Sequence, residues 1–164
     1  HYFNRSIIFP LRINTKKKRI PIFIVLSAFT FNIVNGLFNG YHIYLNVPET
    51  NLFEFNIVLG ALIFIVGMII NVTSDNKLIS LRKEKIVYKI PTGKLFKYVS
   101  CPNYLGEIIE WLGFFILAPS LASLSFLLWT SFNLIPRSIN HHKWYNRKFK
   151  NYPKNRKAII PFIL

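Results

Sequence analysis

The sequence predicts an all-α integral membrane protein, a helical bundle with about four transmembrane helices, and three observations support this fold class. Of the 164 residues, 52% are hydrophobic, 16% are aromatic and 16% are charged, whereas a soluble domain carries about 25% charged residues. The charges are strongly unbalanced, with 21 Lys and Arg against 6 Asp and Glu. All basic residues lie in three blocks, 1–20, 77–97 and 137–157, with long apolar stretches between them. We treat residues 1–164 as one membrane domain.

The same composition excludes several other classes of protein. A nucleic-acid-binding domain would spread its cations over one folded face. The grouping of the basic residues in three blocks between apolar stretches therefore indicates that nucleic acid is not a partner. A disulfide scaffold is excluded because Cys101 is the single cysteine. The high hydrophobic content excludes a disordered chain.

Four apolar stretches approach the length of about 20 residues that a helix needs to cross the hydrocarbon core of a bilayer. They are residues 21–38, 52–72, 104–118 and 121–136. A loop at 39–51 separates the first two, and a short break at Pro119 and Ser120 separates the last two. These segments are the four predicted spans.

The positions of the basic blocks predict an orientation for these spans. Four spans return the chain to its starting side after each pair, so all three basic blocks lie on one face. Both loops on the other face have no Lys or Arg. By the positive-inside rule the basic face is cytoplasmic. We therefore expect an integral membrane protein of the endoplasmic reticulum, if eukaryotic, or of the inner membrane, if bacterial, with its basic loops, and any site beside them, facing the cytoplasm.

Three smaller features carry expectations of their own. The chain begins with His1, and His1-Tyr2-Phe3 is typical of the end of an apolar helix, so we expect an N-terminally truncated protein. Residues 137–164 are basic and aromatic, which suits a juxtamembrane segment held to anionic lipid by about 1 kcal/mol per basic residue. Gly36 and Gly40 would suit a close contact between helices near the outer end of the first span.

Polar side chains at membrane depth are the clearest functional signal, because each is costly there unless it has a partner or a water-filled cavity. Asn103, Glu107 and Glu110 fall at i, i+4 and i+7, which places them on one face of a helix. Trp111 adjoins that face. A structural interpretation stays open, in which these groups only join helices or lie at a frayed helix start in the headgroup layer.

Two further polar clusters flank the predicted spans. Asn71 to Asp75, followed by Arg82, offers donors and acceptors for ribose or amide groups, and an arginine suits a phosphate; alternatively the cluster is a helix exit and a turn. Arg137 to Tyr145 would bind a nucleotide or lipid headgroups. The pair of histidines within it is a weak metal signal without a third ligand at suitable spacing, so we expect no metal. Neither a G-x-G-x-x-G motif after a strand nor a P-loop is present.

Four strings in these clusters and in the tail carry a resemblance to a known family. They are Asn71…Ser74-Asp75…Leu81-Arg82, Tyr88-Lys89-Ile90-Pro91…Gly93…Leu95-Phe96-Lys97-Tyr98-Val99-Ser100, Asn103-Tyr104-Leu105-Gly106-Glu107-Ile108-Ile109-Glu110-Trp111 and Tyr152-Pro153-Lys154-Asn155-Arg156-Lys157-Ala158. In one register from Tyr2 to Leu164, the chain resembles the C-terminal region of the steroid 5-alpha-reductase family. Members are integral membrane enzymes of about seven helices that reduce a carbon–carbon double bond conjugated to a ketone, with NADPH bound inside the bundle.

The resemblance implies roles for particular residues. In the family a Tyr in the motif His-Tyr-Phe-x-Arg activates the substrate carbonyl together with a Glu from an earlier helix; the matching residue is Tyr2, and this sequence lacks that Glu, so the chain alone is expected to be inactive. The cofactor-binding positions are Asn71, Asp75, Arg82, Tyr88, Asn103, Glu107, Arg137, His141 and Tyr145. By charge, Arg82 and Arg137 suit the phosphates of NADPH, and Asn103 and Glu107 suit its nicotinamide amide or ribose. The expected partners are the membrane and a lipid or steroid-like enone.

Three other functions stay open at the level of sequence. Enoyl-thioester and polyprenol reductases of the same superfamily share NADPH and differ in substrate. Membrane methyltransferases that use S-adenosylmethionine carry stretches like Tyr98…Pro102-Asn103-Tyr104…Gly106, but they also carry a pair of Glu after an Arg near the C-terminus, and no acidic residue follows Arg137 here. A basic helical anchor or assembly subunit would explain the charge and not the polar face of 103–110.

Overall fold

The computed structural model of the chain describes residues 1–12, 21–46, 54–84 and 89–164, and within these ranges it is helical without a strand. A π-helical turn, η1 (Asn4–Ile8), continues into α1 (Phe9–Arg12). The longer elements are α2 (Ile22–Asn46), α3 (Phe55–Glu84), α4 (Pro102–Leu117) and α5 (Leu121–Lys148), with a short 3-10 helix, η3 (Lys94–Lys97), before α4. The all-α prediction is confirmed.

Local sequence explains where α4 and α5 begin and end. Pro102 opens α4, where its missing N–H leaves no helical hydrogen bond unmade. Helix α4 ends at Leu117, just before Pro119. Ser120 then caps α5 in a capping box, in which its side chain accepts a hydrogen bond from the Ser123 backbone N–H. Pro136 lies inside α5 and removes one helical donor, yet the helix continues to Lys148.

The closest contact in the fold joins α3 to α4 through two pairs of glycines. Gly60 faces Gly113, and Gly67 faces Gly106. A Cβ built on Gly67 would lie 2.3 Å from the Glu110 backbone nitrogen, and one on Gly106 would lie 2.6 Å from the Asn71 backbone nitrogen. Only glycine allows two helix backbones to approach this closely, so these four positions set the distance between the two helices.

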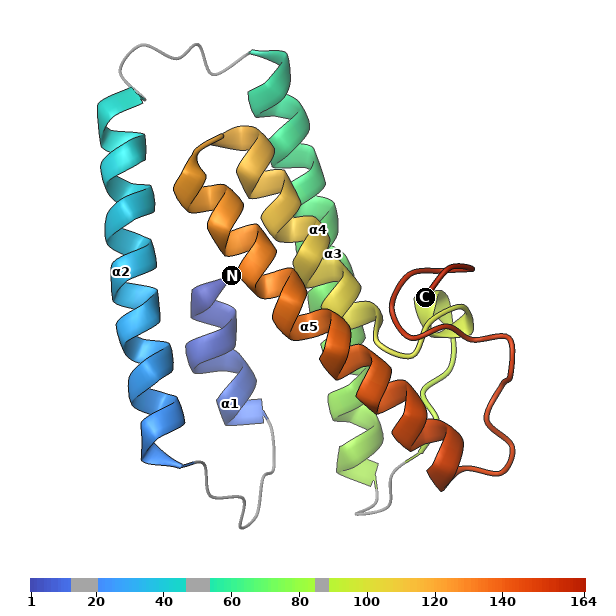
Figure 1. The fold of residues 1–164 in the computed structure, drawn as a ribbon. Coiled ribbons are helices and arrows are strands. Elements are labelled where there is room, and N and C mark those ends of the chain that lie inside the picture. The colour runs from blue at the N-terminus through green and yellow to red at the C-terminus, as the bar shows by residue number, and fades with distance from the viewer. Residues whose placement is uncertain (13–20, 47–53, 85–88) are drawn as a thin grey trace.

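Helix α2 stands apart from the bundle formed by α3, α4 and α5 (Figure 1). Its described contact with that bundle is aromatic: the Phe31 ring stacks on Phe126 and Trp129 of α5, with ring centroids 6.0 and 5.2 Å apart. Most of its apolar side chains are exposed, which is the expected state of a helix surrounded by lipid. Two described helices, Ile22–Leu45 and Phe55–Leu81, are long and apolar enough to cross a membrane.

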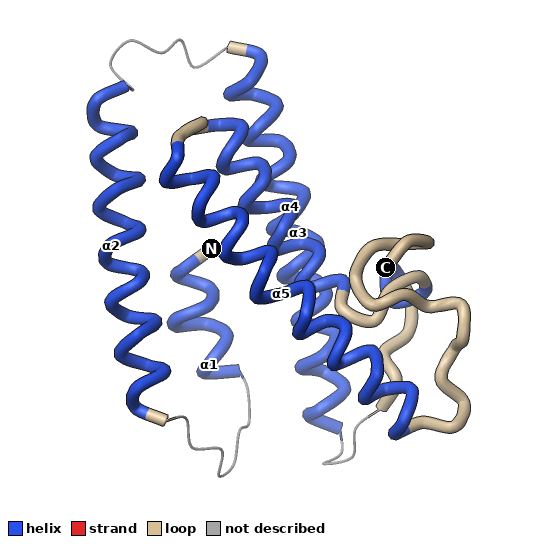
Figure 2. The backbone as a smooth tube through the Cα atoms, in the orientation of Figure 1, coloured by secondary structure: helices blue, strands red, loops and turns tan. Residues whose placement is uncertain are grey.

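The segment after α5 folds back onto the start of α4 and runs as loop and turn (Figure 2). Val99 pairs with Lys157 in an isolated parallel bridge, and the Cys101 N–H donates to the Ala158 carbonyl at 3.1 Å. Ile159 is fully buried and Tyr152 is 5% exposed. Tyr152, Arg156, Ala158 and Ile159 are thus buried against the protein, and the expected contact of the tail with lipid stays a prediction.

Several predicted boundaries differ from the structure. The second helix does not end at Asn71–Asp75 but continues for about two and a half more turns to Glu84, so the alternative of a helix exit there is wrong. The fourth helix extends beyond residue 136 to Lys148, which places the third polar cluster on a helix. Polar residues continue these helices because hydropathy marks only the apolar stretch, whereas backbone hydrogen bonds define the helix. Gly36 and Gly40 meet no described atom within 4 Å, so the close contact expected there is absent.

A matched pair of substitutions tests the glycine contact. Gly106→Ala is expected to destabilise the fold by about 1–3 kcal/mol, since its methyl group would press on the backbone of α3 rather than on a flexible side chain. Gly36→Ala, in open space on α2, is expected to leave stability unchanged or raise it slightly. Thermal unfolding of both variants in detergent measures the difference. Equal melting temperatures would contradict the role of the glycines.

Candidate active site

A cavity of about 880 Å³ lies between η1–α1, α3, α4 and α5. Each of these elements contributes one face to the wall of the cavity. Arg5 and Phe9 come from η1–α1, and the lining residues of α5 are spaced by three or four positions along the helix. The volume lies within the range of small-molecule and cofactor sites. The lining residues are Arg5, Phe9, Asp75, Leu78, Ile79, Ser100, Cys101, Asn103, Tyr104, Glu107, Leu134, Arg137, Asn140, His141, Trp144 and Tyr145.

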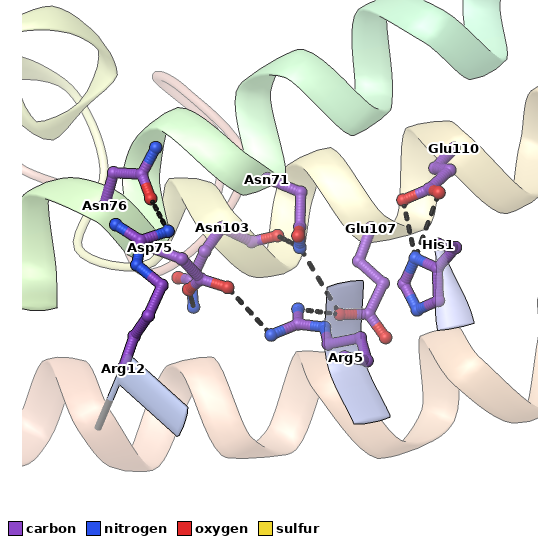
Figure 3. A network of polar contacts seen from close by, with 9 residues as sticks. All are labelled: His1, Arg5, Arg12, Asn71, Asp75, Asn76, Asn103, Glu107 and Glu110. Carbon is purple, nitrogen blue, oxygen red and sulfur yellow. Dashed lines mark hydrogen bonds and ion pairs between the residues drawn. The ribbon is translucent and has the colours of Figure 1, made fainter. Parts of the chain in front are cut away.

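A charged network joins three helices along one wall of this cavity (Figure 3). The Arg5 guanidinium donates to a carboxylate oxygen of Asp75 at 2.8 Å and to one of Glu107 at 2.5 Å. The Asp75 side chain is 5% exposed, that of Glu107 18% and that of Arg5 22%. One cation therefore compensates two carboxylates, and breaking such a part-buried arrangement leaves uncompensated charge.

Two amides extend the network between α3 and α4. Asn71 donates its Nδ2 hydrogens to the Asn103 carbonyl at 2.9 Å and to Glu107 at 3.4 Å. Asn103 in turn donates from Nδ2 to Asp75 at 3.1 Å. These bonds satisfy buried amides that would otherwise destabilise the fold. They also fix which oxygens of Asp75 and Glu107 face the cavity.

A second carboxylate of α4, that of Glu110, lies about one turn beyond Glu107. The Nδ1 atom of His1 is 3.0 Å from both carboxylate oxygens of Glu110, which is fully buried. The His1 ring also makes edge contacts with Tyr2 and with the buried indole of Trp111, at centroid distances of 5.4 and 4.9 Å. Tyr2 is thereby held between His1 and Trp111 while 47% of its surface stays exposed.

Ser100, which lines the cavity, is the centre of a group of hydrogen bonds to α5 and the C-terminal tail. The Ser100 hydroxyl lies 2.6 Å from His142 Nδ1 and 2.6 Å from the Tyr152 hydroxyl. Burial, and then the nearby Lys157, lower the pKa of His142, which favours the neutral imidazole. The Ser100 hydroxyl also donates to the Lys157 carbonyl at 3.1 Å, so it links α5 to the tail. Burial also raises the pKa of Cys101 to about 12, so this cavity residue is a thiol and not a nucleophilic thiolate.

The structure brings most of the predicted site residues together. Six of them line the cavity: Asp75, Asn103, Glu107, Arg137, His141 and Tyr145. Asn71 lies directly behind the wall and bonds to it. Tyr2 is not a lining residue, but it precedes Arg5 by one helical turn. Tyr88 and the side chain of Arg82 lie outside what the structure describes, so their roles stay predictions.

Sequence reasoning does not identify Arg5, the cation that joins Asp75 to Glu107. The charge pattern places it in a basic block at the membrane surface, whereas its guanidinium points into the bundle. The signal that identifies it is helical spacing: His1, Arg5 and Phe9 lie four residues apart and so share a face. Asp75 and Glu107 also require a cation wherever they are buried. No group of three or more His, Cys, Asp or Glu that could hold a metal occurs among the residues described.

Comparison with known proteins assigns the chain to a family. A sequence model of the family described as 3-oxo-5-alpha-steroid 4-dehydrogenase matches residues 18–164. The chain belongs to this family, and the resemblance inferred from the sequence strings is confirmed.

Three curated relatives illustrate how far the similarity extends. The chain is 47% identical to a steroid 5-alpha-reductase of Arabidopsis thaliana and 45% identical to one of Solanum lycopersicum, over 99% of its own length in both cases. It is 41% identical to 3-oxo-5-alpha-steroid 4-dehydrogenase 2 of Sus scrofa, again over 99% of its length. The matched region covers 66%, 65% and 65% of these relatives, respectively. The chain thus spans somewhat less than two thirds of the relatives it matches.

The charge balance of the site predicts the effect of removing its cation. Arg5→Met is expected to destabilise the fold by about 3 kcal/mol, at the low end for a broken buried pair because the side chain is partly exposed. The double variant Arg5→Met/Glu107→Gln is expected to recover part of this loss, since it removes one of the two carboxylates left unpaired. Thermal unfolding in detergent measures both effects.

Arg12→Met is the matched control for this experiment. Arg12 is exposed and bonds only to the neutral Asn76 among the described contacts, at 2.6 Å. Its loss is expected to change stability by less than about 0.5 kcal/mol. A loss of stability equal to that of Arg5→Met would show that the ion pairs of Arg5 contribute no more to stability than an exposed hydrogen bond does.

Proposed function

We propose that this chain forms the cofactor-binding part of a membrane enzyme that reduces the carbon–carbon double bond of a conjugated enone, such as a 3-oxo-4-ene steroid, with NADPH as the reductant. The single observation that carries the proposal is the cavity, whose wall contains six of the residues that the family resemblance assigns to cofactor binding. Those residues come from three helices and were not adjacent in the sequence. The names of the relatives, steroid 5-alpha-reductase and 3-oxo-5-alpha-steroid 4-dehydrogenase, support the same substrate class.

The lining residues fit a cofactor with both phosphates and amide or ribose groups. Arg137 supplies positive charge for phosphate on the α5 side of the cavity, as an arginine suits planar bidentate recognition. Asn103 and Glu107 supply donors and acceptors on the α4 side. Tyr145 and Trp144 add aromatic surface against which a flat ring can lie. When bound, NADPH supplies the hydride that adds to the β-carbon of the enone.

Tyr2 is the proposed catalytic residue. As hydride adds to the β-carbon, negative charge develops on the carbonyl oxygen of the substrate, and a hydroxyl donor at that oxygen stabilises the resulting enolate. The Tyr2 ring is oriented by His1 and Trp111, and His1 is oriented by Glu110. These contacts orient the Tyr2 ring, and a donor that is already oriented needs less reorganisation when the charge forms.

We further propose that α4 and α5 cross the membrane together with α2 and α3, which makes four spans. Among the described helices, α2 and α3 alone meet the length and hydropathy expected of single spans. The support for α4 and α5 is their packing: α4 lies along α3 through the glycine pairs, and the two helices form a hairpin at Pro119 and Ser120. The basic residues then lie on the cytoplasmic face, together with Arg137 and the cavity.

The methyltransferase and the anchor subunit are not supported by the comparisons, which return reductases of steroids. The network of Arg5, Asp75 and Glu107 also lines an open cavity instead of filling a helix interface. Enoyl-thioester and polyprenol reduction would use the same cofactor wall, but no comparison favours them. Steroid-like enones are therefore the substrates with which to test the chain.

Two classes of variant separate cofactor binding from catalysis. Glu107→Gln and Asn103→Ala are expected to weaken NADPH binding by about tenfold or more, because each leaves a polar partner unsatisfied. Tyr2→Phe is expected to leave binding unchanged and to lower turnover on the order of 10²-fold, as for a lost oxyanion donor. NADPH fluorescence titrates binding to the 164-residue chain, and NADPH oxidation with a 3-oxo-4-ene steroid measures turnover in a chimera with the N-terminal segment of a plant relative.

Glu54→Gln and Tyr44→Phe are the matched controls, since both residues are exposed and distant from the cavity. Both controls are expected to bind and turn over as the parent does. If Glu107→Gln bound NADPH as tightly as the parent, the cofactor assignment would fail. Normal turnover by Tyr2→Phe would remove Tyr2 from the reaction without affecting the cofactor assignment.

The topology is tested by labelling single cysteines from one side of the membrane. Cysteines at Asn46, at the end of α2, and at Lys97, in η3, are expected to react from opposite sides. The native Cys101 adds little background, because it is 5% exposed and its pKa is raised to about 12 by burial. Reaction of both introduced cysteines with an impermeant reagent on the cytoplasmic side alone would rule out the four-span arrangement.

A further inference from the structure

A second cavity, of about 660 Å³, lies on a different face of α3 from the candidate active site. From α3, Asp75 and Leu78 line the first cavity, whereas Thr73, Lys77 and Ser80 line the second. The latter three are spaced by four and three residues, so they form one stripe along the helix. The opposite wall is the turn before η3 and η3 itself, residues 92–96. In Figure 1 this turn lies on the opposite side of α3 and α4 from α1.

The wall of this second cavity changes from apolar to cationic along α3. Ile69 and Ile70 lie at one end of the helical stripe, inside the apolar stretch that is long enough to span a membrane. Lys77 lies seven residues beyond Ile70, about 10 Å further along the helix axis. The cavity therefore has a hydrocarbon-like end and a positively charged end, separated by about the distance between the first acyl carbons and the phosphate region of a lipid.

The charge at the polar end is of one sign. Lys77 and Lys94 approach it from the two walls, and none of the described residues that line the cavity is acidic. Thr73 and Ser80 place hydroxyls between the charges. Such a set of groups suits a phosphate ester with adjacent polar atoms.

The backbone of the turn supports a binding role for Lys94. Gly93 has φ of 88° and Lys94 has φ of 46°. The value at Lys94 is in the left-handed region, which is unfavourable for a residue with a Cβ. Strained positions of this kind concentrate where a side chain or backbone serves a ligand. Here the strain directs the chain so that Lys94 lies across the cavity from Lys77.

We propose that this second cavity binds one anionic phospholipid of the surrounding membrane, with the phosphate between Lys77 and Lys94 and the start of the acyl chains against Ile69 and Ile70. The proposal depends on α3 crossing the membrane and not on the enzymatic activity of the chain. An anionic headgroup is favoured over a zwitterionic one, because the cations outnumber the anions at this cavity and a choline group would add another cation.

Native mass spectrometry of the purified chain in neutral detergent measures the bound lipid directly. Dioleoyl phosphatidylglycerol is expected to remain bound, whereas dioleoyl phosphatidylcholine at the same concentration is expected to dissociate. Lys77→Gln/Lys94→Gln is expected to weaken retention of the anionic lipid on the order of tenfold or more. Ser80→Trp, which keeps both lysines and fills the cavity, is expected to abolish retention.

The control variant Lys148→Gln/Lys150→Gln removes the same charge from exposed positions at the end of α5. It is expected to retain phosphatidylglycerol as the parent does, and circular dichroism shows that each variant keeps its helix content. Equal loss in the control, or retention by either cavity variant, would overturn the proposal. Displacement of the lipid by inorganic phosphate at equal concentration would also overturn it, since the site would then recognise free phosphate.

Discussion

The close approach of α3 to α4 is the constraint on which the rest of the structure depends. Without a Cβ at Gly60, Gly67, Gly106 and Gly113, the two backbones lie in direct contact. In a membrane, where no hydrophobic effect drives helices together, such contact is a main source of association. It also places Asn71 within 2.9 Å of the Asn103 carbonyl, so the polar wall of the cavity is a consequence of the glycines.

Charge within the bundle is arranged so that the site stays electrostatically balanced without closing the cavity. Arg5 lies between two carboxylates, and His1 lies against a third. Each anion therefore has a partner from the N-terminal turn, and this turn in turn positions Tyr2. The proposed cofactor site and the proposed catalytic hydroxyl are thus linked through one short helical segment.

Much of the fold and part of the site follow from sequence alone. Hydropathy identifies α2 and α3, and the break at Pro119 and Ser120 identifies the hairpin of α4 and α5. The spacing of Asn103, Glu107 and Glu110 correctly places them on one side of α4.

Sequence reasoning does not show which residues pair across long distances in the chain. The rule that places basic residues at the membrane surface gives the wrong location for Arg5. It considers only where a basic residue lies along the sequence, whereas Arg5 lies inside because Asp75 and Glu107 there need a cation. The glycine pairs were missed for the same reason: each spacing of seven is uninformative until the opposite helix is known.

The separation of these partners along the chain has a consequence for how the protein folds. His1 and Glu110 are 109 residues apart, and Arg5 and Glu107 are 102 apart, whereas only residues 118–120 separate α4 from α5. Entropy opposes the closure of long loops more than that of short ones, and non-local contacts slow folding. The local α4–α5 hairpin therefore has a kinetic advantage over the docking of His1 and Arg5 against α4. The charged wall of the cavity exists only once residues 102 and 109 positions apart have met, so its shape depends on the slowest class of contact in the fold.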